Sequence, residues 1–175
     1  MSAQLATVLP LLPAPAERGL ILHVDEDEAL RRSTAALLRY AGFETREAGC
    51  GESALTQVEA LRGRLDVLIV DYDLGPGMTG TELAEDFARL LGHAVPTVML
   101  CDDPANAEVP WLTDAPVWVA RKPLLADTLL AALPPLVAFR RAIEATRTSA
   151  SLPPALPDYL PYTAASRAPD SARCP

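Results

Sequence analysis

Length, composition and charge fit one folded domain and argue against two classes of partner. The chain has 175 residues, of which 50% are hydrophobic and 22% charged, which is typical of a globular protein with a single core. Its formal net charge of −8 opposes nonspecific binding to nucleic acid or to an anionic membrane surface. No apolar run approaches a membrane span, and Pro10, Pro13 and Pro15 interrupt the apolar N-terminal stretch, so we expect neither a membrane helix nor a signal peptide.

Prolines mark the expected limits of the folded domain. Only Pro76 lies between residues 16 and 95, whereas prolines gather near both ends of the chain. Segments rich in proline, serine and alanine bury too little apolar surface to fold alone. We therefore expect four segments: a disordered arm over residues 1–18, the domain over 19–133, a helical extension over 134–148 and a disordered tail over 149–175.

The cysteines indicate the compartment. Cys50, Cys101 and Cys174 show neither a metal-ligand spacing nor an even number for disulfide pairing. Free cysteines are typical of reduced, intracellular proteins. We therefore expect a cytoplasmic protein.

The first half of the chain alternates short apolar runs with helical patterns. Residues 19–24 form an apolar run that ends in the acidic turn 25–28, and apolar residues then recur with the helical period. Gly42 is placed to end this helix. A second strand is expected over residues 43–48 and a second helix over 52–61.

The central apolar run ends at an aspartate. Residues 67–70 are Val, Leu, Ile and Val, which is typical of a strand buried on both faces of a parallel sheet, and Asp71 follows directly. The carboxyl ends of parallel strands form the edge at which α/β proteins bind ligands. The glycine-rich turn 75–80 then leads to a helix over 81–91 and a fourth strand over 95–101.

The next elements are less regular because prolines interrupt them. Pro104, Pro110 and Pro116 leave little room for a regular helix over residues 102–115, so the fourth helix is expected to be short or missing. A fifth strand is expected over 117–120, followed by a turn and by a fifth helix over residues 124–133.

Two consecutive prolines follow the fifth helix. Pro134 and Pro135 remove backbone donors, so we expect them to break it. Helical spacing resumes over residues 136–147, which predicts an extra C-terminal helix. Its apolar stripe is expected to cover either the domain's own surface or a second copy of the chain, which leaves a homodimer open.

This alternation predicts an α/β fold, a doubly wound parallel sheet of five strands with helices on both faces. The strand ends then bring a set of chemically active residues to one edge: Asp25, Glu26, Asp71, Cys101 and Lys122. Three carboxylates suit a hard divalent cation such as Mg²⁺, and Lys122, the only lysine in the chain, would neutralise phosphoryl oxygens. Such a site favours phosphoryl transfer, with a carboxylate able to act as the nucleophile.

These motifs, in this order, resemble the receiver domain of two-component response regulators over residues 19–133. The resemblance rests on Asp25 and Glu26 after the first strand, Asp71 after the third with the 77–80 Gly-Met-Thr-Gly turn behind it, and Lys122 after the fifth. The separations agree as well, since Asp71 follows Asp25 by 46 positions and precedes Lys122 by 51.

The resemblance implies a flavodoxin-like fold and a phosphoacceptor. Asp71 would take a phosphoryl group from the phosphohistidine of a histidine kinase or phosphotransfer protein, and Lys122 would pair with the phosphoryl oxygens. Mg²⁺ would be held by Glu26, Asp71 and the backbone carbonyl of Asp73, with Asp25 acting through water. The chain would be a bacterial, cytoplasmic, single-domain response regulator that signals to an unknown downstream protein and has no enzyme activity beyond its own phosphotransfer and autodephosphorylation.

Three departures from the family pattern concern the response to phosphate. The switch position after strand four, normally Thr or Ser, is Cys101, whose thiol is a weaker donor than a hydroxyl. The usual switch aromatic is replaced by Val119, with Trp118 beside it. The fourth helix is interrupted by prolines, and the turn after Asp71 carries one extra residue near Gly75. We therefore expect the proline-rich stretch 102–115, more than strand five, to respond to phosphorylation.

Two rival functions are left open. One is a receiver-shaped binding module that never uses phosphate. The other is a phosphatase of the haloacid dehalogenase type, because Asp71 and Asp73 after an apolar strand also resemble its nucleophile and acid/base pair; that family places the pair on its first strand. The simplest alternative is that Asp71 is a solvated turn residue and that residues 25–28 only stabilise a helix N-terminus. No output domain is recognised in residues 148–175, so we expect no direct binding of nucleic acid.

Overall fold

Five short parallel strands form the centre of the protein. The computed structural model describes residues 18–61, 63–75, 77–104 and 115–148. The strands are β1 (Leu20–Val24), β2 (Glu44–Ala48), β3 (Val67–Asp71), β4 (Thr97–Cys101) and β5 (Val117–Arg121). They pair in the order β2-β1-β3-β4-β5, with every neighbouring pair parallel. The chain reverses its direction of winding between β1 and β3, which is where such sheets open a crevice at their carboxyl edge.

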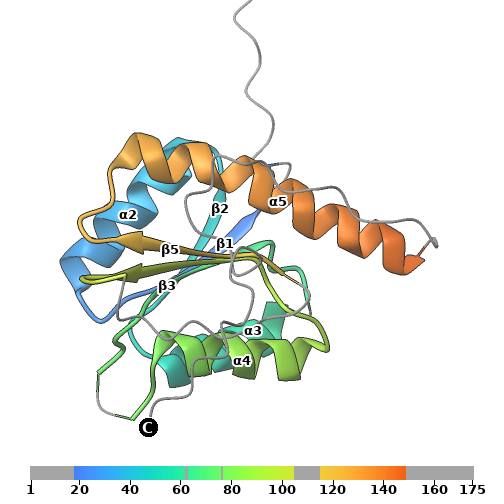
Figure 1. The fold of residues 1–175 in the computed structure, drawn as a ribbon, viewed down its shortest axis with the longest axis horizontal. Helices are drawn as coiled ribbons and strands as arrows, with labels where there is room; N and C mark the ends of the chain where they lie inside the picture. The colour runs from blue at the N-terminus through green and yellow to red at the C-terminus, as the bar shows by residue number, and fades with distance from the viewer. Residues whose placement is uncertain (1–17, 62, 76, 105–114, 149–175) are drawn as a thin grey trace, which may run out of the picture.

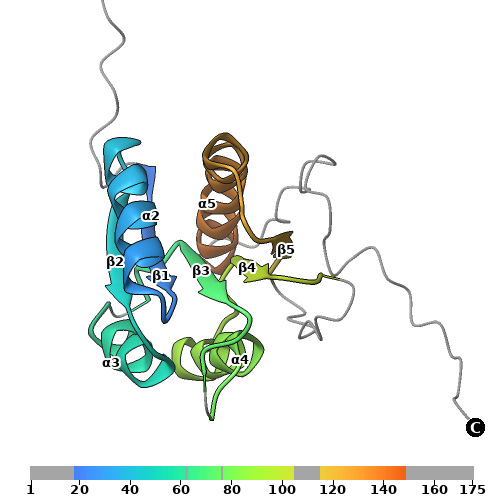
Figure 2. The same ribbon diagram turned by 90° about the vertical axis from the view of Figure 1, so that its left-hand side faces the viewer.

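The helices of the described residues lie in two layers. They are α2 (Glu28–Tyr40), α3 (Gly51–Leu61), α4 (Gly80–Leu91) and α5 (Ala126–Thr148). Figures 1 and 2 show α2 and α5 on one face of the sheet and α3 and α4 on the other. The predicted α/β fold with a doubly wound sheet is therefore confirmed. None of these helices is long and apolar enough to cross a membrane.

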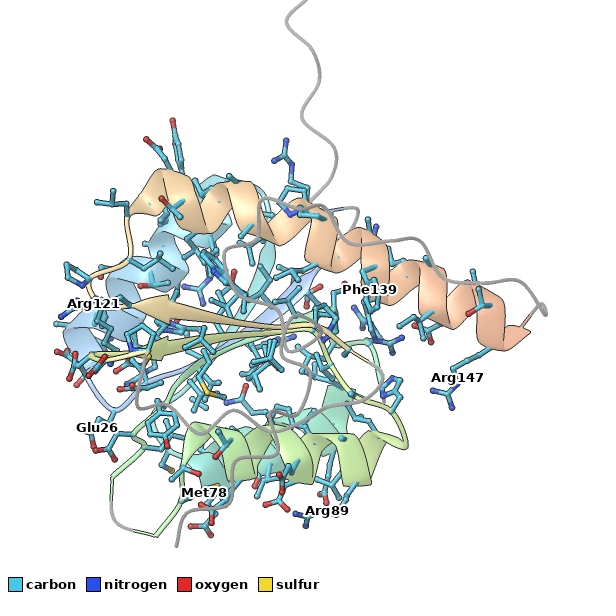
Figure 3. All side chains as sticks on the ribbon, in the orientation of Figure 1. Glu26, Met78, Arg89, Arg121, Phe139 and Arg147 are labelled. Atoms are coloured by element: carbon cyan, nitrogen blue, oxygen red, sulfur yellow. The ribbon has the colours of Figure 1, made fainter. Side chains whose placement is uncertain are left out.

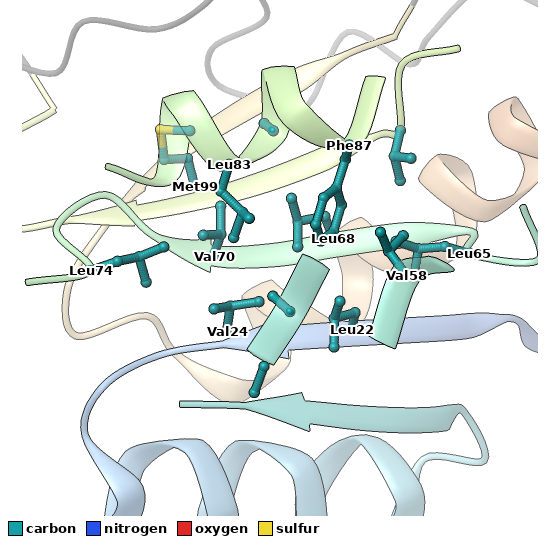
Figure 4. Close-up of a cluster of buried hydrophobic side chains, with 14 of the residues drawn as sticks. Leu22, Val24, Val58, Leu65, Leu68, Val70, Leu74, Leu83, Phe87 and Met99 are labelled. Atoms are coloured by element: carbon teal, nitrogen blue, oxygen red, sulfur yellow. The ribbon is translucent and has the colours of Figure 1, made fainter. Parts of the chain in front are cut away.

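The core consists of two apolar layers, one on each face of the sheet. Alternate residues of a strand point to opposite faces, so in β3 Leu68 and Val70 face α3 and α4, whereas Val67 and Ile69 face α2 and α5. Phe87 of α4 packs into the first layer (Figure 4). All five residues of β3 are buried, as its unbroken apolar run predicts.

Helix α5 corrects one expectation. Pro134 and Pro135 do not break it, because α5 runs as one helix from Ala126 to Thr148 with both prolines inside. Proline in a helix interior costs about 3 kcal/mol. The buried stripe stays in phase across the prolines, however: it comprises Leu129, Ala132, Leu133, Leu136, Val137 and Arg140. Burying several large apolar side chains at roughly 1.5–3 kcal/mol each outweighs the loss.

The predicted helical extension over 134–148 is therefore the second half of α5 and not a separate piece. Figure 1 shows this half running past the edge of the sheet. Arg140 anchors the second half of α5 to the domain. Its side chain is only 2% exposed, donates to the Gly63 carbonyl at 3.2 Å and contacts the His93 ring.

Some sequence predictions lie outside the described residues. The arms over 1–18, apart from Arg18, and over 149–175 are among them, and so is most of the short or missing fourth helix, residues 105–114. These stay predictions, as does the homodimer.

Substitutions in α5 test the balance between proline and burial. Replacing exposed Pro134 by alanine (Pro134→Ala) restores a backbone donor, which stabilises the helix. The added freedom of the unfolded chain offsets part of this gain, so the free energy of unfolding should rise by about 1 kcal/mol. Leu136→Ala, at a fully buried position, should lower it by about 3 kcal/mol. Urea unfolding followed by circular dichroism measures both. A loss of stability in Pro134→Ala would contradict this account of α5.

Candidate functional site

Three of the predicted site residues meet at the carboxyl edge of the sheet. Asp25 follows β1, Asp71 ends β3 and Lys122 follows β5. The Lys122 Nζ lies 2.5 Å from Asp71 Oδ2 and 3.8 Å from Asp25 Oδ2. Two carboxylates thus share one ammonium group, although the three residues are far apart in the sequence. The parallel order of β1, β3 and β5 produces this arrangement because it places their carboxyl ends along a single edge.

Asp25 is held by hydrogen bonds to its side chain and backbone, and one of its carboxylate oxygens lacks a donor among the described residues. Its side chain is almost wholly buried, and its Oδ1 accepts a 2.8 Å hydrogen bond from the backbone N–H of Asp27. Its backbone carbonyl accepts from the Arg31 guanidinium at 2.6 Å. Its buried Oδ2 has no hydrogen-bond donor among the described residues. A buried carboxylate oxygen without a donor is costly unless a cation or water satisfies it.

Glu26 follows Asp25 after the end of β1, and Asp73 lies two residues beyond Asp71 at the end of β3. Figure 3 shows Glu26 near the same end of the molecule as Met78, far from Arg147 at the end of α5. The Glu26 carboxylate approaches Gly75, in the loop that follows β3. The Asp73 side chain is used within that loop, where its Oδ1 accepts from the Gly75 N–H at 3.0 Å. The Asp73 side chain is therefore engaged locally, which agrees with a role for its backbone carbonyl alone.

The residues present fit a hard divalent cation. In the part of the chain that the structure describes, no three His, Cys, Asp or Glu side chains are already gathered around a single point. The fit rests instead on the unsatisfied Asp25 Oδ2, with the carboxylate of Asp71 beside it. Mg²⁺ takes few protein carboxylates and retains several waters, so a partial set of oxygen ligands is what it requires.

The surroundings of Asp71 and Lys122 raise the pKa of both groups. Burial raises the pKa of Asp71, and the charge of Asp25 adds to this, although the hydrogen bond from Lys122 opposes it. Burial alone would lower the pKa of Lys122, but the hydrogen bond and charge of Asp71 outweigh burial, so the pKa of Lys122 is raised. Lys122 is thus a firmly protonated cation next to a carboxylate that is poorly stabilised as an anion.

The two switch-position residues are buried in the core, and Cys101 also lies at the edge that carries Lys122, since its backbone carbonyl accepts from the Lys122 N–H at 2.8 Å. The Cys101 thiol donates to the Ala120 carbonyl at 3.8 Å, and burial raises its pKa, so it remains a thiol. Cys101 and Val119 both pack in the layer that faces α3 and α4. Trp118 lies in the opposite layer and so does not occupy the space of the missing aromatic.

The loop after Asp71 contains contacts that the sequence did not reveal. A side chain on Gly80 would collide with the Asp71 carbonyl, and one on Gly51 would collide with the Met78 sulfur. Thr79 caps α4 in a capping box with Glu82. The Thr-x-x-Glu spacing of this capping box was readable in the sequence, whereas Arg31 and the two glycine contacts depend on tertiary packing.

The fold and the site together define a class of protein. It comprises α/β proteins that gather acidic residues and a lysine at the carboxyl edge of a parallel sheet. A family model described as the response regulator receiver domain matches residues 21–132. Because this match covers more than half of the chain, the protein belongs to the response regulator receiver domain family. The recognition made from the motifs is confirmed.

Known relatives agree with this assignment. The DNA-binding response regulator MtrA of Mycolicibacterium smegmatis is 41% identical over 85 residues, which are 47% of this chain and 34% of that protein. The receiver domain of the hybrid histidine kinase CckA is 30% identical, with a TM-score of 0.56 over 68% of this chain and 99% of that one. A receiver domain from Clostridium thermocellum, at 21% identity and a TM-score of 0.63, covers 71% and 98% and supports the fold alone.

The chain spans about a third or less of the length of the curated relatives it matches. The similarity therefore concerns the receiver domain, and the functions of the remaining parts of those proteins do not transfer with it.

Removing the charge of Asp71 should stabilise the protein in the absence of metal. Its pKa is raised in the folded state, so its ionisation opposes folding above the folded pKa and has no effect below the unfolded value of 3.8. Asp71→Asn should therefore raise the melting temperature at pH 7 without divalent cations, and the gain should vanish near pH 3. Thermal melts at both pH values measure this; a lower melting temperature at pH 7 would show that the ion pair with Lys122 dominates.

His23 should make the protein sensitive to mild acid. It is wholly buried in β1, neither ring nitrogen has a hydrogen-bond partner among the described residues, and burial lowers its pKa to about 4. The unfolded chain takes up this proton near pH 6.5, so stability is full above that pH and falls as the pH drops toward 4. Between pH 7 and pH 5 the loss should be about 2 kcal/mol.

The variant His23→Leu provides the control for this loss. It removes the titrating ring while keeping an apolar side chain of similar size in the strand. Urea unfolding of wild type and variant at the two pH values should show a nearly flat profile in His23→Leu. An equal pH dependence in both proteins would assign the acid sensitivity to other groups.

Proposed function

We propose that this chain is a phosphoacceptor receiver that takes a phosphoryl group on Asp71 from a histidine kinase or a phosphotransfer protein. The observation that carries the proposal is the contact of Lys122 Nζ with Asp71 Oδ2 at 2.5 Å and with Asp25 Oδ2 at 3.8 Å. A carboxylate beside an ammonium group and a second carboxylate has the composition that phosphoryl transfer requires, because the chemistry depends on positioning and charge neutralisation.

The proposed reaction uses the residues as follows. A carboxylate oxygen of Asp71 attacks the phosphorus of a phosphohistidine whose other ring nitrogen carries a proton. The O–P bond forms as the P–N bond breaks, and the histidine leaves as a neutral imidazole. Lys122 turns from the Asp71 carboxylate to the phosphoryl oxygens and neutralises part of their charge. Asp25, Glu26, Asp71 and the Asp73 carbonyl would hold Mg²⁺, which supplies further positive charge to the same oxygens.

The proposed output is a contact with another protein. The net charge of −8 gives no attraction to nucleic acid, and the match to DNA-binding relatives covers only their receiver part. Catalysis by the chain would be limited to its own phosphorylation and dephosphorylation, and its place of action would be the cytoplasm. The kinase and the downstream protein would be identified by phosphotransfer and binding assays.

A labelling experiment tests the assignment of Asp71. Incubation with small-molecule phosphodonors and with purified histidine kinases should add one phosphoryl group to the wild type, read by intact mass. Asp71→Asn should abolish the label, because an amide is not a nucleophile at neutral pH. The matched control is Asp86→Asn, which alters a carboxylate on α4 that pairs with Arg89. Full labelling of Asp71→Asn at an unrelated position would refute the assignment.

One observation favours a second candidate, a receiver-shaped module that works without phosphate. The Cys101 thiol is engaged with the Ala120 carbonyl and remains protonated, so it offers only a weak donor to a phosphoryl oxygen. Fluoroberyllate, which mimics the phosphoryl group, separates the candidates. A Mg²⁺-dependent complex that disappears in Asp71→Asn supports phosphoacceptance, whereas no complex with folded wild type supports the module.

A further inference from the structure

Gly75 lies directly against the carboxylate of Glu26. A Cβ atom built on Gly75 would be 3.0 Å from Glu26 Oε2, which is tighter than ordinary contacts of Cβ atoms. Gly75 also has a φ of +80°, a conformation that residues with side chains adopt rarely. The loop after β3 therefore leaves a gap where Glu26 enters, and the gap exists because residue 75 has no side chain.

The loop that contains Gly75 is held by contacts at both of its ends. The Asp73 side chain accepts from the Gly75 N–H at 3.0 Å, and Asp73 and Thr79 form an antiparallel bridge across the loop. Gly80 then presses against the Asp71 carbonyl. The loop is thus tied to β3 at one end and to the start of α4 at the other, so it would not simply move aside for an added methyl group.

The identity of the acidic residue explains why such a gap is needed. Glu26 carries one methylene more than an aspartate would, so its carboxylate reaches further from β1 toward the loop after β3. The two groups come from residues 49 positions apart in the sequence, and they meet only because β1 and β3 are adjacent. A longer acid and a loop residue without a side chain are complementary at this point.

We infer that Gly75 is a positioning residue for Glu26. It holds open the space that the Glu26 carboxylate occupies next to the loop after β3, from which Glu26 would serve a divalent cation together with Asp25 and Asp71. The inference rests on the proposed function, and it extends it by coupling the length of the acidic side chain to the composition of the loop. Gly75 has no side chain to offer as a ligand, so its effect acts through Glu26.

The chain provides a closely matched control for this inference. Gly77 lies in the same loop and has a φ of +104°, but a Cβ atom there would meet nothing within 4 Å. Both substitutions place a side chain at a positive φ, and Gly75 also precedes Pro76, which restricts its backbone further. Only Gly75→Ala crowds Glu26. The melting temperature of each metal-free variant measures its backbone strain separately from its effect on metal binding.

Titration of the full chain with Mg²⁺ alone, followed by amide shifts in NMR spectra, tests the specific effect. Gly75→Ala should weaken Mg²⁺ binding about tenfold, as is usual when a residue that orients a metal ligand is changed. Gly77→Ala should stay within about twofold of the wild type. Equal weakening in the two variants would overturn the inference.

A second pair of variants removes the cause of the crowding. In a Glu26→Asp background the carboxylate is shorter and withdraws from residue 75, so adding Gly75→Ala should cause less than about a twofold further loss of Mg²⁺ affinity. The same tenfold loss in both backgrounds would overturn the inference. If Gly75→Ala and Gly77→Ala bind Mg²⁺ equally well while Asp71 is still phosphorylated, this inference alone fails. If Gly75→Ala weakens Mg²⁺ binding only when residue 26 is Glu, while Asp71 takes no phosphate, the proposed function alone fails.

Discussion

The structure of the site depends on two carboxylates that share one ammonium group. Asp25 and Asp71 are both buried at the carboxyl edge of the sheet, and Lys122 is the cation that reaches both. Like charges in a buried site repel strongly unless something neutralises them. Lys122 offsets only one of the two negative charges, so the surrounding backbone holds the pair together and one negative charge remains at the site.

Packing around the site supplies the force that holds these charges in place. β1 and β3 are buried on both faces, so neither strand can withdraw its aspartate without exposing apolar surface on two sides of the sheet. Arg31 fixes the backbone of Asp25, and Gly80 lets α4 begin against the Asp71 carbonyl. The stability of the core thus maintains an arrangement of charges that opposes folding when considered alone.

The same packing constrains how a change at Asp71 can reach the rest of the fold. Cys101 and Val119 belong to the apolar layer against α3 and α4, whereas Trp118 belongs to the layer against α2 and α5. The loop after Asp71 also reaches that first layer, because Met78 packs against Gly51 at the start of α3. The contacts of the strand that ends at Asp71 and of the loop after it therefore lead toward α3 and α4 at least as directly as toward β5.

Local sequence patterns were sufficient to predict the strands, the fold class and the convergence of Asp25, Asp71 and Lys122. An apolar run such as β3 is typical of a strand buried on both faces, and the alternation with helices places that strand in a parallel sheet and aligns the strand ends. Residue chemistry suggested a divalent cation and phosphoryl transfer at this edge, and the family resemblance assigned the individual roles. The sequence misled at Pro134 and Pro135, because proline acts locally while the burial of Leu133 and Leu136 against the sheet is a tertiary effect.

Only the tertiary structure decided how residues distant in sequence constrain each other. It brought Gly75 against Glu26, Gly51 against Met78, and Arg140 against the Gly63 carbonyl. It also decided which layer receives Val119 and which receives Trp118, since alternation along a strand separates the two residues but does not say which helices cover each face. The physical reason is common to all these cases: a pattern of residues records local preference and periodicity, whereas the space available to a side chain is set by chain segments that approach it from elsewhere in the fold.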